Sequence, residues 1–297
     1  MLKIAHVINP VRVNPASDLC ISQPITFESM RIAQRHVLGQ LKVDLLAVGY
    51  DEDKSVMPDG FDILPPLSRS VQDIGCFEQQ HKLPILSDIL ERLFAGTEAD
   101  FLIYTNVDIG LQPDFYLAVQ QFIARGFDAF VINRRTITKV YREVAQLSEI
   151  GSEKGQAHRG WDCFVFRRGY FPQFILGDIC IGAPRAGLAL LANLIAAADH
   201  FSEFTEEHLT FHLGDDRVHT DSLFQAYADH NSRQLDRVLV QLEQRYGRFL
   251  RNTPVGAYLF KRRVFGRYYE SWSRHVYMPA SWSQGLNRLL GKLPGSK

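Results

Sequence analysis

The sequence predicts an α/β protein with a single, mostly parallel twisted sheet covered by helices and a helical C-terminal appendage. Short, continuous apolar runs alternate with longer segments whose apolar residues recur at helical spacing. Continuous apolar strands are typical of parallel sheets that are buried on both faces. From residue 233 onward this alternation gives way to basic and aromatic residues. We therefore expect a main domain over residues 1–230 and an appendage over residues 231–297.

The opening elements form a βαβ pattern. Residues 3–8 are predicted to be a strand, residues 26–41 a helix and residues 43–48 a second strand. Pro84 then occupies a position that a first helical turn tolerates, and leucines and isoleucines follow it at helical spacing. The apolar run 101–105 is predicted to be the next strand.

The second half continues the alternation less regularly. Pro113 and Gly126 mark the start and the end of a predicted helix, and residues 127–133 form the next strand. Residues 136–160 are polar and weakly periodic, which favours a surface excursion and leaves a mobile lid as the alternative. A strand over 161–166 and an interior helix over 186–198 follow.

Composition narrows the function classes. Lys plus Arg and Asp plus Glu each number 33, so no global field attracts the chain to nucleic acid. The four cysteines lie too far apart in sequence for a compact zinc motif, and we expect reduced thiols. The first residues lack the pattern of a signal peptide, and the longest apolar run, 186–198, is too short to span a bilayer. We therefore expect a soluble, cytoplasmic protein.

Polar side chains follow several predicted strands. Asn9, Asp51, Asn106, Asp108 and Arg134 each come after an apolar run. In parallel α/β sheets, ligands bind beyond the carboxyl ends of the strands. The sequence therefore predicts a polar binding rim at that edge.

Within this rim, Asn106-Val107-Asp108 contains two oxygen donors that suit a hard divalent cation. The alternative is a turn that caps the next helix. A later segment, Phe211-His212-Leu213-Gly214-Asp215-Asp216, has an imidazole and two carboxylates that could complete such a site. The alternatives there are a structural histidine and a helix-capping turn.

These features resemble the nucleotide-sugar half of GT-A fold glycosyltransferases over residues 1 to about 230. The strand that ends in Asn106-Val107-Asp108 stands where that family has its DxD motif. The blocks 161–166 and 211–216 resemble its acceptor-side acidic segment and its late metal-contacting histidine. The resemblance implies a Rossmann-related sheet, a nucleoside-diphosphate sugar donor and a hydroxyl acceptor. It also implies Mn²⁺ or Mg²⁺ at Asp108 and His212.

The resemblance also implies where the donor would bind. Asn9, Asp51, Thr105 and Asn106 would face it, and Lys82 or Arg134 would meet its phosphates. Solvated surface charges are the alternative for the two cations. Asn106 departs from the family pattern because it replaces the first Asp of the motif. The site thereby loses one negative charge and metal affinity should fall, so a metal-independent or inactive member is an open alternative.

An inverting transfer would need a carboxylate that accepts the proton of the acceptor hydroxyl. Asp162, Asp178 and Asp216 are the candidates, and a retaining mechanism stays open. A nucleotidyltransferase is a second hypothesis, although residues 11–23 lack the glycine-rich segment that such enzymes usually need.

A third hypothesis is a non-catalytic binding or scaffold protein. Its contact would be the segment 258–269, where Lys and Arg interleave with Tyr and Phe. That segment suits a peripheral contact with the inner membrane and a lipid-linked acceptor, or stacking on bases. The alternative is a helical appendage packed on the main domain. We expect no specific nucleic-acid binding.

Overall fold

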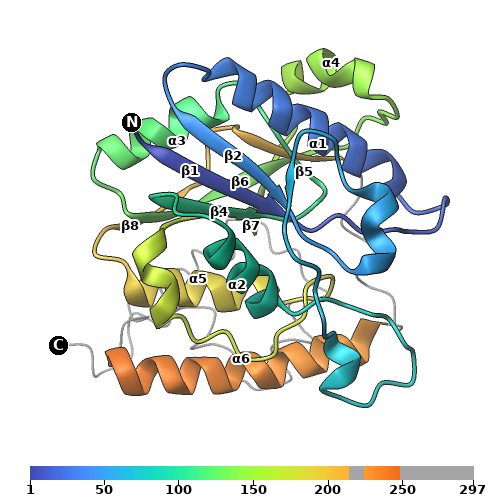
Figure 1. The fold of residues 1–297 in the computed structure, drawn as a ribbon, viewed down its shortest axis with the longest axis vertical. Helices are drawn as coiled ribbons and strands as arrows, with labels where there is room; N and C mark the ends of the chain where they lie inside the picture. Colours follow the sequence, from blue (N-terminus) through green and yellow to red (C-terminus); the bar gives the residue numbers. More distant parts are fainter. Residues whose placement is uncertain (214–223, 248–297) are drawn as a thin grey trace, which may run out of the picture. The chain divides into compact units, whose positions relative to one another are not determined.

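The computed structural model describes residues 1–213 and 224–247 and shows a mixed, mostly parallel sheet between two helical layers (Figure 1). Its strands are β1 (Lys3–Ile8), β2 (Lys42–Ala47), β3 (Asp62–Ile63), β4 (Phe101–Thr105), β5 (Ile109–Leu111), β6 (Ala129–Ile137), β7 (Gln156–Arg167), β8 (Phe201–Phe204) and β9 (Thr210–Leu213). Its α-helices are α1 (Leu19–His36), α2 (Leu86–Gly96), α3 (Phe115–Ala124), α4 (Leu147–Ser152), α5 (Ala186–Ala197) and α6 (Gln225–Tyr246). Four 3-10 helices are η1 (Asp51–Val56), η2 (Val71–Asp73), η3 (Val144–Gln146) and η4 (Arg168–Gln173). The predicted fold class is thereby confirmed for the described part of the chain.

The strands follow the order β3-β2-β1-β4-β7-β6-β9-β5, and β8 pairs with β6 beside β9. Neighbours run parallel from β3 to β4, and β8 and β9 are parallel to β6. Strand β7 is antiparallel to both β4 and β6, and β5 is antiparallel to β9. Because β7 runs backward, its first residues reach the edge at which β4 and β6 end.

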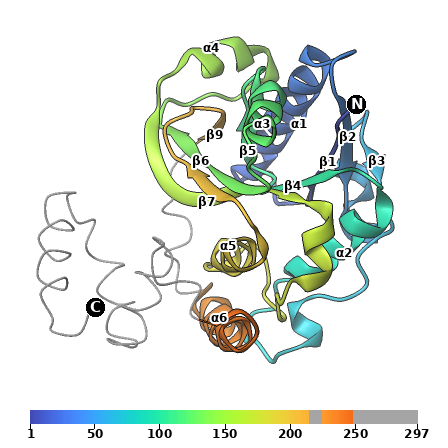
Figure 2. The same cartoon turned by 90° about the vertical axis from the view of Figure 1, so that its left-hand side faces the viewer.

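Apolar side chains on the two faces of the sheet define the layers. On one face, Ile103, Phe130 and Val165 pack with Met30 of α1 and Phe115 of α3 in one buried cluster. On the other face lie α2 and α5, and α6 packs on α5 (Figure 2). Helix α5 is apolar nearly all round because it lies between the sheet and α6, as the sequence predicts.

Several elements extend beyond their predicted boundaries. Helix α1 begins at Leu19, two turns before the predicted start, and includes Pro24. The side chain of Gln23 bonds the backbone of Val11 in both directions, which anchors this early turn to the loop after β1. Strand β6 continues to Ile137 because β7 and β9 both pair with its end, so Arg134 lies within a strand and not after one.

The predicted excursion over residues 136–160 is ordered structure. It contains η3, α4 and the start of β7. Ile150 of α4 and Tyr141 are buried with Ile25 of α1 and Phe211 of β9 in a cluster of their own. These apolar anchors are too widely spaced to give a periodic signal in the sequence.

The predicted division into a main domain and an appendage stays a prediction, because most of the appendage lies outside the described residues. The described residues up to 247 belong to one compact unit. The predicted boundary at residues 230/231 falls inside α6, whose residues Leu235, Val238 and Leu242 are buried. The basic aromatic segment 258–269 lies outside the described residues, so the membrane contact proposed for it stays a prediction. In the described chain, no helix combines the length and apolarity needed to cross a bilayer.

Helix α5 approaches the start of β7 so closely that only glycine fits at its second position. A β-carbon on Gly187 would lie 2.6 Å from the carbonyl oxygen of Trp161 and 3.3 Å from the ring of Phe164. We expect Gly187→Ala to destabilise the protein by about 1–3 kcal/mol through overpacking, although alanine is the better helix former. Urea unfolding measures the loss.

The control is Gly169→Ala, since a β-carbon there meets nothing within 4 Å. Equal stability of the Gly187→Ala variant and the unchanged protein would contradict the close approach of α5 to β7.

Candidate functional site

The motif Asn106-Val107-Asp108, called the acidic motif below, forms the turn between β4 and β5. Its backbone is held by the start of β7, because the amide of Asn106 donates to the carbonyl oxygen of Asp162 at 3.3 Å. The register of β4 on β7 pairs Thr105 with Cys163, so Asn106 and Asp162 come next to each other at the rim. The structure therefore brings together two predicted site residues that lie 56 positions apart in sequence.

A chain of polar contacts runs across the rim from β4 to β6. The hydroxyl of Tyr104 donates to Oδ1 of Asn106 at 3.1 Å, and Nδ2 of Asn106 donates to Oδ1 of Asp162 at 3.0 Å. The other oxygen of Asp162 forms an ion pair with Nη1 of Arg134. The side chains of Asp162 and Arg134 are only 12% and 9% exposed, so solvent screens this pair weakly.

A second pair lies on the other side of the turn. Ile109 of β5 pairs with His212 of β9, and Nε2 of His212 lies 3.2 Å from Oδ2 of Asp108. Burial opposes ionisation of Asp108, but the hydrogen bond with His212 and the positive charge of Arg134 outweigh it. The pKa of Asp108 therefore lies below its ordinary value. Asp108 is held as a carboxylate beside an imidazole.

Asp108 and His212 are the described residues that suit a divalent cation. They supply one oxygen donor from the turn after β4 and one nitrogen donor from β9, which fits Mn²⁺ or Mg²⁺ if phosphate oxygens and water complete the coordination. Within residues 1–213 and 224–247 no group of three His, Cys, Asp or Glu side chains lies close enough to hold a metal. Asp215 and Asp216 lie outside the described residues.

Thr105 belongs to the interior of the sheet. It is fully buried, and its hydroxyl lies 2.9 Å from Nε2 of His6 on β1. Nδ1 of His6 lies 2.9 Å from the hydroxyl of Tyr116 on α3. Burial lowers the pKa of His6 to about 3, so the imidazole is neutral at physiological pH. Thr105 therefore fixes the end of β4 and offers no exposed atom to a substrate.

The ends of β1 and β2 are tied to each other by a residue that the sequence does not single out. Asp53 is 3% exposed, and its two oxygens accept the backbone amides of Tyr50 and Arg12 at 3.0 and 2.8 Å. Asn9, which was predicted to face the donor, donates its side-chain amide to the carbonyl of Val48. In the run Asp51-Glu52-Asp53 nothing distinguishes the buried carboxylate from its exposed neighbours.

Two of the charged residues predicted near the donor, Asp51 and Lys82, lie at the surface. Asp51 is exposed and pairs with Lys54 at 2.8 Å. Lys82 pairs with Glu52, and its ammonium lies 4.0 Å from the centre of the Tyr50 ring. Such exposed pairs contribute little to stability, and the contacts of Lys82 do not include the Asp108 group.

The contacts of Asp178 are with residues outside the acidic motif. One of its oxygens is 3.2 Å from Nη1 of Arg69, and Arg69 also forms a two-point pair with Asp88 of α2. The backbone oxygen of Asp178 lies 2.7 Å from Nε2 of His230 on α6. These contacts join the loop before α5 to α2 and α6. They share no residue with the network of Asn106, Asp162 and Arg134.

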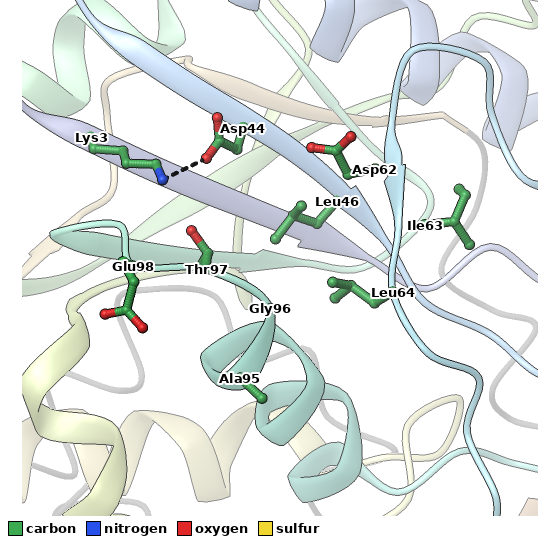
Figure 3. A pocket seen from close by; sticks show the side chains of 10 residues that line it. All are labelled: Lys3, Asp44, Leu46, Asp62, Ile63, Leu64, Ala95, Gly96, Thr97 and Glu98. Carbon is green, nitrogen blue, oxygen red and sulfur yellow. Dashed lines mark ion pairs between the residues drawn. The ribbon is translucent and has the colours of Figure 1, made fainter.

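A hollow of about 470 Å³ lies at the opposite edge of the sheet, between the amino ends of β1 and β2 and the end of α2 (Figure 3). Lys3 and Asp44 form an ion pair of 3.3 Å in it, and Leu64 and Thr97 line the side toward α2. Ligands in parallel sheets bind at the carboxyl ends of the strands, so we place the candidate site at the rim and not in this hollow.

The four cysteines are free in the structure. Cys20 and Cys76 are exposed, and Cys163 and Cys180 are buried. Burial raises the pKa of the Cys180 thiol to about 12, which leaves it unreactive at neutral pH.

No family model and no curated protein matches the chain. Similar solved structures include S. aureus TarS residues 1–349 in complex with UDP-GlcNAc, at 9% identity and a TM-score of 0.43, over 83% of this chain and 74% of that one. They also include Mycobacterium tuberculosis glucosyl-3-phosphoglycerate synthase in complex with Mg²⁺ and UDP, at 12% identity and a TM-score of 0.44, over 83% and 80%. Likeness at this level is distant, so function has to be inferred from the residues at the rim.

Acid titration of His6 should weaken the fold. The unfolded histidine binds a proton near its ordinary pKa of 6.5 and the folded one only near about 3, so acidification through this window favours unfolding. Between pH 6.5 and 4.5 we expect His6 alone to lower the free energy of unfolding by roughly 2–3 kcal/mol. Urea unfolding over that range should show a shallower pH dependence for His6→Gln than for the unchanged protein.

His36→Gln is the matched control, because His36 is exposed at the end of α1. Parallel pH profiles for His6→Gln and the unchanged protein would show that His6 is not held neutral.

Removal of Arg134 should leave a buried carboxylate without its partner. We expect Arg134→Met to lower the free energy of unfolding by about 3 kcal/mol, with little dependence on salt, because both side chains are nearly buried. Lys54→Met breaks the exposed pair with Asp51, whose side chains are 73% and 69% exposed, and should cause no measurable loss. Denaturant unfolding in low and high salt compares the two. Equal losses for the two variants would show that the Asp162–Arg134 pair is not desolvated.

Proposed function

We propose that this protein is a glycosyltransferase that moves a sugar from a nucleoside-diphosphate sugar to a hydroxyl acceptor. The observation that carries the proposal is the pair of Asp108 and His212 at the carboxyl edge of the sheet, with Oδ2 and Nε2 3.2 Å apart. A carboxylate and an imidazole at this edge suit a divalent cation bound to a diphosphate. The order of the motif within the βα series agrees with the GT-A pattern seen in the sequence.

Each group has a defined part in the proposed transfer. The oxygen of the acceptor hydroxyl bonds to the anomeric carbon, and the bond from that carbon to the phosphate oxygen breaks with its electron pair left on the nucleoside diphosphate. A divalent cation held by Asp108 and His212 would neutralise the charge that develops on this leaving group. Arg134 lies on β6, which pairs with the strand of His212, and places a guanidinium at the same rim.

The proton of the acceptor hydroxyl needs a carboxylate base. Asp162 is engaged by Asn106 and Arg134, and Asp178 by Arg69, and a carboxylate paired with a guanidinium is a weakened base. Asp216 lies outside the described residues and stays a candidate from the sequence. The acceptor, the sugar and the stereochemical outcome also stay open.

Nucleotide binding tests the proposal directly. UDP, GDP, CDP and dTDP are titrated with and without Mn²⁺ against the unchanged protein, Asp108→Ala and His212→Ala, with calorimetry and thermal shift as the measurements. We expect at least one nucleotide to bind in a Mn²⁺-dependent way, and each substitution to weaken that binding on the order of tenfold or more.

Asp59→Ala is the control, because Asp59 is an exposed acid outside the rim. Failure of all four nucleotides to bind would refute the transferase, and unchanged binding in Asp108→Ala would refute the proposed cation site.

A further inference from the structure

The amide of Asn106 is used at both ends within the protein. Its Oδ1 accepts the hydroxyl of Tyr104 at 3.1 Å, and its Nδ2 donates to Asp162 at 3.0 Å. An ionised carboxylate only accepts hydrogen bonds, so the nitrogen of Asn106 must face Asp162 and the oxygen must face Tyr104. Burial raises the pKa of Tyr104 far above its ordinary value, which keeps its hydroxyl protonated as a donor.

Asp162 in turn requires a donor at position 106. Its Oδ2 is paired with Arg134, and the side chain is 12% exposed, so little water is available to solvate Oδ1. An aspartate at position 106 would set a second carboxylate against Oδ1 and remove the donor. Two anions in hydrogen-bond contact with limited solvent repel each other strongly.

We propose that Asn106 is a positioning residue that holds Asp162 against Arg134, and that it is not a weakened ligand of the cation. The assignment of separate roles rests on the proposed function, in which Asp108 and His212 bind the cation. Asn106 then fixes the Asp162–Arg134 ion pair beside them. The hydrogen-bonded series Tyr104–Asn106–Asp162–Arg134 would then fix the position of the Arg134 guanidinium at the rim.

A residue swap separates these two roles. In Asn106→Asp/Asp162→Asn, the new carboxylate still accepts from Tyr104 and from the new amide, and the oxygen of that amide still accepts from Arg134. The swap therefore keeps each hydrogen bond of the series and one carboxylate, whereas Asn106→Asp loses the donor to Asp162 and Asp162→Asn loses the negative charge paired with Arg134. Asn14→Asp is the charge-matched control, since Asn14 is exposed and its Oδ1 only accepts the amide of Ala16.

Thermal unfolding at neutral pH without metal or nucleotide is measured first. We expect Asn106→Asp and Asp162→Asn each to lower the Tm on the order of 5 °C and the swap to regain at least half of the larger loss. Asn14→Asp should leave the Tm within about 1 °C. If Asn106→Asp does not fold, a folded swap supports the proposal and an unfolded swap overturns it.

Mn²⁺ binding measured by calorimetry is the second readout. A positioning role predicts that Asn106→Asp binds Mn²⁺ no more tightly than the unchanged protein. Tighter Mn²⁺ binding by Asn106→Asp, with a Tm at or above that of the unchanged protein, would identify position 106 as a cation ligand and overturn the proposal. A swap no more stable than the weaker single variant would also overturn it. The thermal comparison needs no nucleotide, so it stands even where the transferase proposal fails.

Discussion

The reversed direction of β7 is the constraint on which the rim depends. Strands β4 and β6 run parallel to each other but do not pair, and β7 lies between them and bonds to both. Because β7 is antiparallel, Asp162, which precedes the partner of Thr105 on β7, reaches the edge where Asn106 follows β4 and where Arg134 lies near the end of β6. A parallel strand in this place would carry Asp162 toward the opposite edge, where β4 begins. The polar chain across the rim therefore follows from strand direction as much as from residue type.

Beneath this rim, buried hydrogen bonds join the strands and the loops that follow them. His6 joins β1 to the end of β4 through Thr105 and to α3 through Tyr116. Asp53 ties the loop after β1 to the loop after β2 through two backbone amides. Each contact crosses between elements far apart in sequence and satisfies a polar group that would be costly to bury alone. The end of β4 is therefore held in place by His6, and the turn that carries Asp108 begins directly after it.

Much of this architecture could be predicted from the sequence where the signal is local. The strand Phe101–Thr105 matches its prediction and the helix Ala186–Ala197 ends one residue before the predicted end, because continuous apolar runs define both. Helix α1 begins at Leu19, before its predicted start at residue 26, and the contact of Gln23 with Val11 anchors this early turn. Asn106 and Asp108 were predicted from a strand end and His212 from the later segment 211–216, but the register that places Asn106 beside Asp162 is not encoded in any short window.

The same register alters the meaning of an amide in an acidic motif. Taken alone, Asn106 in place of Asp removes one negative charge and indicates weaker cation binding. On the neighbouring strand β7, however, Asp162 already places a carboxylate oxygen 3.0 Å from the side-chain nitrogen of Asn106, and Arg134 balances the charge of Asp162. A further aspartate would place three acids, including Asp108, around one guanidinium. The neutral side chain at position 106 therefore keeps the local charge balanced and leaves Asp108, with His212, as the carboxylate of the proposed cation site.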